Sequence, residues 1–378
     1  MIASMNASIG DDRLPLSALL SMALVAFTIE FDNEFEHQAP HRTTDFGSTP
    51  GFPGAPWLVS MVMWSRFLRF VPDDGISVRE LMRRSGSSKE ELKLWLTRLS
   101  KWWGYLAVLP AEAGAGSSRK DMIVRPTAGG RKALEVWRPL TAAIEERWEQ
   151  RFGRKTMDAM RESLRAVAGQ LDMSLPDSLP ILGYGLFSKA PDAFRCSPAA
   201  TSELSLPGLL SKVLLAFAIE FERASEVSLA IAANVLRLVE AGDVRLRNLP
   251  RQAGVSKEAI ATAVSFLEKR GYAAQAHESA TLRAKVLLLT AKGRRAAEAY
   301  LETVRNIEEQ WRTRFGGELV GGLREALERL AGEPDAQQSP LMAALRPCPD
   351  CWRASLPAAE TLPHFPMILH RGGFPDGS

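Results

Sequence analysis

Apolar residues spaced three and four positions apart recur through the second half of the chain, a spacing typical of amphipathic helices. It predicts helices over residues 206–222, 229–239, 257–270 and 293–315. Between the second and third of these, Gly254 marks a turn that follows a short helical segment, and Ser256 is placed to cap the next helix. The pattern therefore predicts a helix, a tight turn and a second helix around Gly254.

Two runs with strand-like patterning follow the helix that ends at Gly271. They cover residues 272–276 and 283–289 and flank a polar tip. Such a pair predicts a β-hairpin, which would project from the helices as a wing. A long helix over 293–315 then closes the unit.

The same unit occurs earlier in the chain. Residues 19–36 match 209–226 at ten of eighteen positions without a gap, and residues 125–153 match 288–316 at thirteen of twenty-nine. Residues 85–106 mirror 253–274, and the tail motif at 181–187 resembles that at 368–374. We therefore expect both halves to adopt one fold, with domains at 14–195 and 206–378 joined by a linker at 196–205.

Composition places the chain among ordinary soluble proteins, because 46% of its 378 residues are hydrophobic and 24% are charged. The net charge is only +3, so contacts with nucleic acid would have to come from local basic patches. Three cysteines favour a reducing compartment, and we expect a cytoplasmic protein. The uncharged stretch at 14–29 is interpreted as a buried helix, because its sixteen residues are short for a membrane span and the net negative charge of Asp11, Asp12 and Arg13 argues against a signal peptide.

The order of helix-turn-helix, β-hairpin and long closing helix resembles the MarR family of winged-helix transcription regulators. The recognition helix of that family and the start of its wing are similar to residues 254–272, GVSKEAIATAVSFLEKRGY. The end of the wing and the start of the dimerisation helix are similar to residues 289–300, LTAKGRRAAEAY. Residues 86–106 and 126–137 occupy the same places in the first half. Members act as dimers joined through their first and last helices.

The resemblance implies a mainly α fold with two tandem winged helix-turn-helix domains that form an intramolecular pseudo-dimer. One polypeptide would act as a fused dimer and bind double-stranded DNA at a pseudo-palindromic site, with half-sites roughly 34–36 Å apart. It also implies a small-molecule effector that lodges between the domains and releases the DNA. No membrane partner is expected.

The predicted recognition helices have distinct faces. Leu92, Leu96 and Leu99, and likewise Ile260, Val264 and Leu267, are expected to face the core. The residues expected to contact DNA lie at the helix starts, on the outward faces and on the wings: Ser88, Lys89, Lys93, Thr97, Arg119, Lys120, Ser256, Lys257, Thr262, Ser265, Arg283 and Lys285.

The small net charge and the missing recognition arginines favour a rival class, an interaction or ligand-sensing scaffold that no longer binds DNA. Leu94 and Thr262 stand where the family often has an arginine that reaches base edges. The first turns carry Glu90, Glu91 and Glu258, which favour the helix dipole but would repel phosphates.

The other residue groups in the sequence do not predict a metal site or a catalytic site. Cys348, Cys351, His364 and His370 have the spacing of a zinc finger, but Pro363 and Pro366 bracket His364, and a finger needs its histidines on a helix. We therefore predict no metal site and no cofactor. The sequence has no Gly-rich phosphate loop and no arrangement of nucleophile and base, so we predict no enzyme activity.

Two pairs of equivalent residues concern packing. Glu30 and Glu220 lie on largely apolar helices, where a carboxylate needs a partner. Each could pair with an arginine across the pseudo-dimer or face a ligand cavity, and we favour the pair with arginine. Trp148 and Trp311 are expected to pack at the junction of the two halves.

Overall fold

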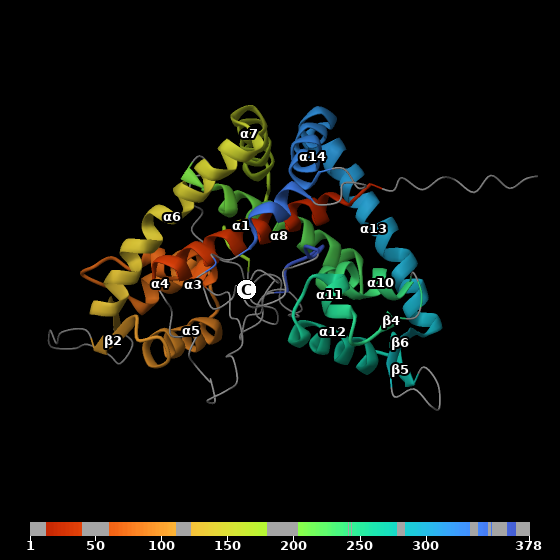
Figure 1. The fold of residues 1–378 in the computed structure, drawn as a ribbon, viewed down its shortest axis with the longest axis horizontal. Helices are drawn as coiled ribbons and strands as arrows, with labels where there is room; N and C mark the ends of the chain where they lie inside the picture. Colours follow the sequence, from red (N-terminus) through yellow and green to blue (C-terminus); the bar gives the residue numbers. More distant parts are fainter. Residues whose placement is uncertain are drawn as a thin grey trace, which may run out of the picture.

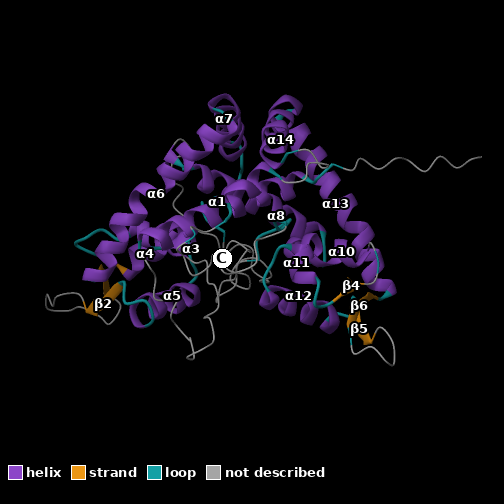
Figure 2. Ribbon diagram, viewed as in Figure 1, coloured by secondary structure: helices purple, strands orange, loops and turns teal. Residues whose placement is uncertain are grey.

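The computed structural model describes residues 13–39, 60–110, 122–179, 203–240, 242, 244–277, 284–332, 339–346, 349 and 361–367. Over these residues the protein is mainly α-helical and carries two small antiparallel sheets, as Figure 2 shows. The predicted mainly α class is confirmed. Arg119, Lys120, Arg283 and both copies of the tail motif lie outside the described residues.

The first half contains, in chain order, α1 (Leu16–Gln38), α3 (Ser60–Arg66), the 3-10 helix η1 (Leu68–Phe70), β1 (Ile76–Ser77), α4 (Val78–Ser85), α5 (Lys89–Lys101), β2 (Leu106–Pro110), β3 (Met122–Pro126), α6 (Ala128–Phe152) and α7 (Arg154–Gly169). Its sheet has the strand order β1-β3-β2, and all pairs are antiparallel.

The second half contains α8 (Leu206–Ala224), α9 (Leu229–Ile231), the π-helical turn η4 (Ala232–Leu236), α10 (Arg237–Glu240), β4 (Val244–Arg245), α11 (Leu249–Ala253), α12 (Lys257–Lys269), β5 (Ala273–His277), β6 (Lys285–Leu289), α13 (Ala291–Phe315), α14 (Gly317–Ala331) and the 3-10 helix η5 (Pro340–Ala344). Its sheet has the equivalent strand order β4-β6-β5. The expected hairpin is present, and β4 adds a third strand that was not predicted.

The repeated Thr-x-x-Gly motif joins each hairpin to its long helix. Thr127 Oγ1 accepts a hydrogen bond from the backbone N–H of Gly130 at 3.0 Å, and so caps α6. A Cβ atom on Gly130 would meet the carbonyl oxygen of Tyr105 at 2.0 Å, so only glycine lets the strand approach the helix this closely. Thr290 and Gly293 repeat both contacts at the start of α13.

The helices α1 and α8 cross at the centre of the molecule, and α7 packs against α14 above them (Figure 1). α1 is long and apolar enough to span a membrane by length and composition, but 94% of its most apolar window is buried inside the protein. The expectation of a buried helix near the N-terminus is therefore confirmed. One continuous hydrophobic core runs through both halves.

Each half caps the first helix of the other. The backbone N–H of Leu16, at the start of α1, donates to Oε1 of Glu308 on α13 at 2.6 Å. The backbone N–H of Leu206, at the start of α8, donates to Oε1 of Glu145 on α6 at 2.8 Å. Arg324 and Arg161 form ion pairs with these two glutamates. The carboxylates satisfy free N–H groups at the positive ends of the helices, so the capping ties the two halves together.

Candidate nucleic-acid interface

The two helices expected to read DNA, α5 and α12, lie on the same side of the molecule, and the sheets lie toward its two outer ends (Figure 1). Ser88 Oγ accepts a hydrogen bond from the backbone N–H of Glu91 at 3.1 Å, and Ser256 Oγ accepts one from Ala259 at the same distance. Both serines are therefore helix caps, and Ser256 is buried.

The predicted core faces are correct. Leu92, Leu96, Leu99, Ile260, Val264 and Leu267 are all buried. The exposed residues of the predicted contact set are Lys89, Lys93, Thr97, Lys257, Thr262 and Lys285. Ser265 is half-buried. The structure thus leaves the polar faces of α5 and α12 open to solvent, as the periodicity predicts.

Glu91 is an exception to the expectation that the first-turn glutamates face the DNA. Its side chain is only 1% exposed and pairs with Arg66 of α3, which is equally buried. Nη2 of Arg66 donates to both carboxylate oxygens of Glu91, at 2.6 and 2.7 Å. The carboxylate therefore holds α5 against α3 and repels no phosphate. Glu90 and Glu258 remain exposed.

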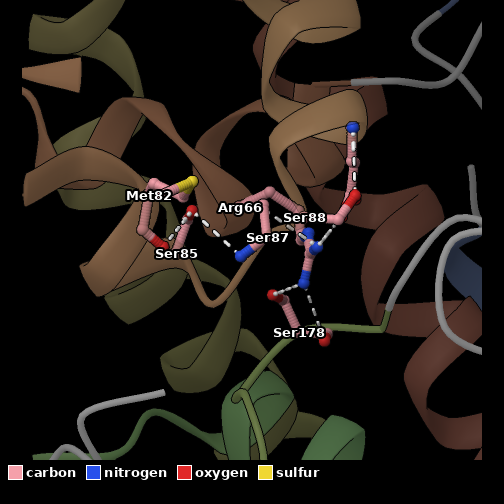
Figure 3. A network of polar contacts seen from close by, with 7 residues as sticks. Arg66, Met82, Ser85, Ser87, Ser88 and Ser178 are labelled. Carbon is pink, nitrogen blue, oxygen red and sulfur yellow. Dashed lines mark hydrogen bonds and ion pairs between the residues drawn. The ribbon is translucent and has the colours of Figure 1, made fainter. Parts of the chain in front are cut away.

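Arg66 also connects α5 to the segment that follows α7 (Figure 3). Nη2 donates to Ser87 Oγ at 3.1 Å in the turn before α5, and Nη1 donates to Ser178 Oγ at 3.2 Å. The N–H of Ser87 in turn donates to Ser85 Oγ at the end of α4. A single buried guanidinium thus joins four segments. Sequence reasoning missed it, because an arginine in an apolar segment has no periodic signature.

In the second half, the positions equivalent to Arg66 and Glu91 hold no ion pair beside α12. Asn234 and Arg66 each stand twenty positions before the glycine of their turn, and Ala259 replaces Glu91. The buried amide of Asn234 donates to the carbonyl of Phe365 at 2.7 Å and accepts from the N–H groups of His364 and Phe365. The described C-terminal segment, 361–367, is therefore fixed to the core at η4.

That segment also contacts α1 and the turn before α12. Ser21 Oγ of α1 donates to the carbonyl of Pro363 at 2.8 Å. Gly254 has φ +70°, and a Cβ there would meet the carbonyl oxygen of Thr361 at 2.7 Å. The turn therefore needs glycine both for its backbone conformation and for the close approach of the C-terminal segment.

His364 lies in this segment and is partly buried. Desolvation, with a smaller effect from the nearby positive charge of Arg237, lowers the pKa of its imidazole to about 3. Cys348, Cys351 and His370, the other three residues with zinc-finger spacing, lie outside the described residues. Within the described part of the chain, no group of three or more His, Cys, Asp or Glu side chains could hold a metal ion.

Glu30 and Glu220 have arginine partners, but from their own halves. Glu30 pairs with Arg151 of α6 at 2.6 Å, and Glu220 pairs with Arg314 of α13 at 3.3 Å. The expectation of a pair across the halves is wrong, because the long helix of each half runs alongside its own first helix. The indole N–H groups of the equivalent tryptophans donate to the same glutamates, Trp148 at 3.1 Å and Trp311 at 2.7 Å.

The two tryptophans also pack within their own halves. Trp148 meets the ring of Phe27 edge to face, and Trp311 meets Phe217 in the same way. Each therefore joins the long helix to the first helix of its own half.

No protein-family model and no curated protein matches the chain. The geometry of α5, α12 and their surroundings therefore carries the functional assignment.

Proposed function

We propose that the chain is a DNA-binding transcription regulator made of two tandem winged helix-turn-helix domains that form an intramolecular pseudo-dimer. The observation that carries the proposal is the pairing of α5 and α12. Each follows a short helix and a left-handed glycine turn, each precedes a hairpin, and both lie on one side of the molecule (Figure 1). Two exposed helices in this relation suit successive major grooves on one face of a duplex.

The packing supports an intramolecular pair. α1 packs on α8 and α7 on α14, so the first and last helices of each half meet their counterparts. This arrangement is the one that the resemblance to the MarR family implies. We propose that one chain is the functional unit, that it acts in the cytoplasm, and that a small-molecule effector regulates it.

Positive charge on the exposed faces would supply the attraction to phosphate. Lys89 and Lys93 are exposed on α5, as are Lys257 on α12 and Lys285 on β6. Because the whole chain carries a net charge of only +3, affinity would come from these local groups and fall steeply with salt.

A double charge reversal tests the proposal. We expect the chain to bind duplex DNA at low salt, and Lys93→Glu with Lys257→Glu to weaken binding at least tenfold. The slope of log affinity against log salt should also become shallower by about 0.9 for each phosphate that is no longer neutralised. The matched control is Lys155→Glu with Arg329→Glu, which makes the same charge change at exposed positions on α7 and α14. Absence of a complex at low salt, or equal weakening in both double variants, contradicts the proposal.

The rival class, an interaction or ligand-sensing scaffold, is favoured by one observation. A groove beside α12, about 630 Å³ in volume, is lined by apolar and polar side chains in equal number, and its apolar part could hold a ligand. If the folded chain binds no duplex at low salt, that groove becomes the candidate site of a protein or small-molecule partner.

A further inference from the structure

The exposed faces of α5 and α12 differ at their centres. Both begin with a lysine directly after the capping serine, Lys89 in α5 and Lys257 in α12. One turn later, α5 exposes Lys93, whereas α12 exposes Ala261 at the equivalent position. The exposed faces of the two helices therefore carry different chemistry at this equivalent position.

A groove of about 630 Å³ runs beside this small residue. Its apolar lining comes from Leu246, Pro250, Ile260, Ala261 and Val264, which belong to the start of α11, the segment before it, and α12. Because residue 261 is alanine, no long side chain at that position covers the groove.

The charged groups around the groove suit an anionic ligand such as a DNA backbone better than a basic partner. Arg247 and Lys257 line it and bring two positive charges. Glu268 also lines it, but its carboxylate accepts a hydrogen bond from Gln275 Nε2 at 3.0 Å. Thr262 Oγ1 donates to the carbonyl of Glu258 at 2.9 Å, so the donor of that hydroxyl is used inside the helix.

We propose that the two helices read unlike half-sites, and that α12 recognises thymine through its C5 methyl group. The inference rests on the proposed function. Apolar contact from alanine or a threonine methyl is the usual recognition of that group in the major groove, and Ala261 and Thr262 provide it. Lys93 gives α5 a different preference, because lysine donates to the O6 and N7 atoms of guanine.

Selection from a pool of random duplexes by the full-length chain tests the proposal first. The expected motif has two unequal halves about one helical turn apart, one with conserved T·A pairs and one with conserved G·C pairs. A symmetric motif, or a T-containing half that Ala261→Lys leaves unchanged, overturns the proposal.

Replacing the conserved thymines by deoxyuridine, which lacks only the methyl group, gives the sharper test. Each contacted methyl should contribute about fourfold in affinity, and its removal should leave the other half-site unaffected. Ala261→Lys, which copies α5 but leaves the methyl of Thr262, should reduce the difference between thymine and deoxyuridine. Because residue 261 is exposed, the thermal midpoint of this variant should equal that of the wild type.

Several outcomes separate this proposal from the one on which it rests. Salt-dependent binding without an enriched motif, or equal affinity for thymine and deoxyuridine, overturns the methyl readout and leaves DNA binding in place. Failure to bind any duplex overturns both. A doubling of the solution mass that Ala261→Lys prevents would make the groove a contact between copies of the chain, and would also overturn the proposal.

Discussion

The ion pair between Arg66 and Glu91 allows a stability prediction with an internal reference. Both side chains are 1% exposed, so Glu91→Ala would leave a buried guanidinium whose remaining partners are the hydroxyls of Ser87 and Ser178 and the carbonyl of Ser178. Breaking a buried pair from one side costs about 3–5 kcal/mol, because the remaining charge stays desolvated. We expect the free energy of unfolding to fall by that amount.

The second half of the chain supplies the compensated variant. Asn234 and Ala259 occupy the places of Arg66 and Glu91 there, so Arg66→Asn with Glu91→Ala removes both charges in a combination that the chain already uses. We expect this double variant to be more stable than Glu91→Ala alone, although it contains one more substitution.

Urea unfolding of the full chain, followed by tryptophan fluorescence, measures these differences. Glu90→Ala is the control, since it removes an exposed carboxylate from the same first turn and should cost less than about 0.5 kcal/mol. The reasoning fails if Glu91→Ala costs no more than Glu90→Ala. It also fails if the double variant is destabilised by the sum of the two single effects.

Two further predictions concern the C-terminal segment, 361–367. Gly254→Ala should destabilise the protein by at least about 1 kcal/mol more than Gly271→Ala. Both glycines have φ near +70°, but only the new methyl at 254 would meet a backbone oxygen, that of Thr361. Equal thermal midpoints for the two variants would contradict this prediction. The pKa of His364 is about 3 in the folded chain and near 6.5 in the unfolded chain, so the unfolded chain takes up the proton first as the pH falls. The free energy of unfolding should therefore decrease as the pH falls from 6.5 toward 3. Between pH 7 and pH 5 the loss should be about 2 kcal/mol. His364→Asn, which removes the titratable imidazole, should remove this loss in urea titrations at the two pH values, and an unchanged pH dependence would show that another group is responsible.

Periodicity predicted the helices and their buried faces because each position on a helix repeats its environment every 3.6 residues. The cap at Ser256 was recognisable for a related reason, since a cap needs a small oxygen-bearing side chain directly before the first turn. The strands β1 and β4 were missed because each has two residues, too few for an alternating pattern. The helices α7 and α14 follow the long helices after Gly153 and Gly316, and the prediction stopped at those breaks.

The contacts that hold α5 and α12 in place could not be predicted, because they join residues far apart in the sequence. Ser178 lies 112 positions from Arg66, and Phe365 lies 131 positions from Asn234. The sequence showed that Glu30 needed a partner, since a carboxylate on an apolar helix is costly alone. It could not show which helix would bring that partner.

The covalent link between the halves has a consequence for how they can differ. In an assembly of identical chains, any substitution on the reading helix appears twice, whereas here Lys93 and Ala261 occur together in every molecule. On the proposal of unlike half-sites, a bound duplex would have a defined polarity, with one end always beneath α5. The protein would then sit in a single orientation relative to the start of a neighbouring gene.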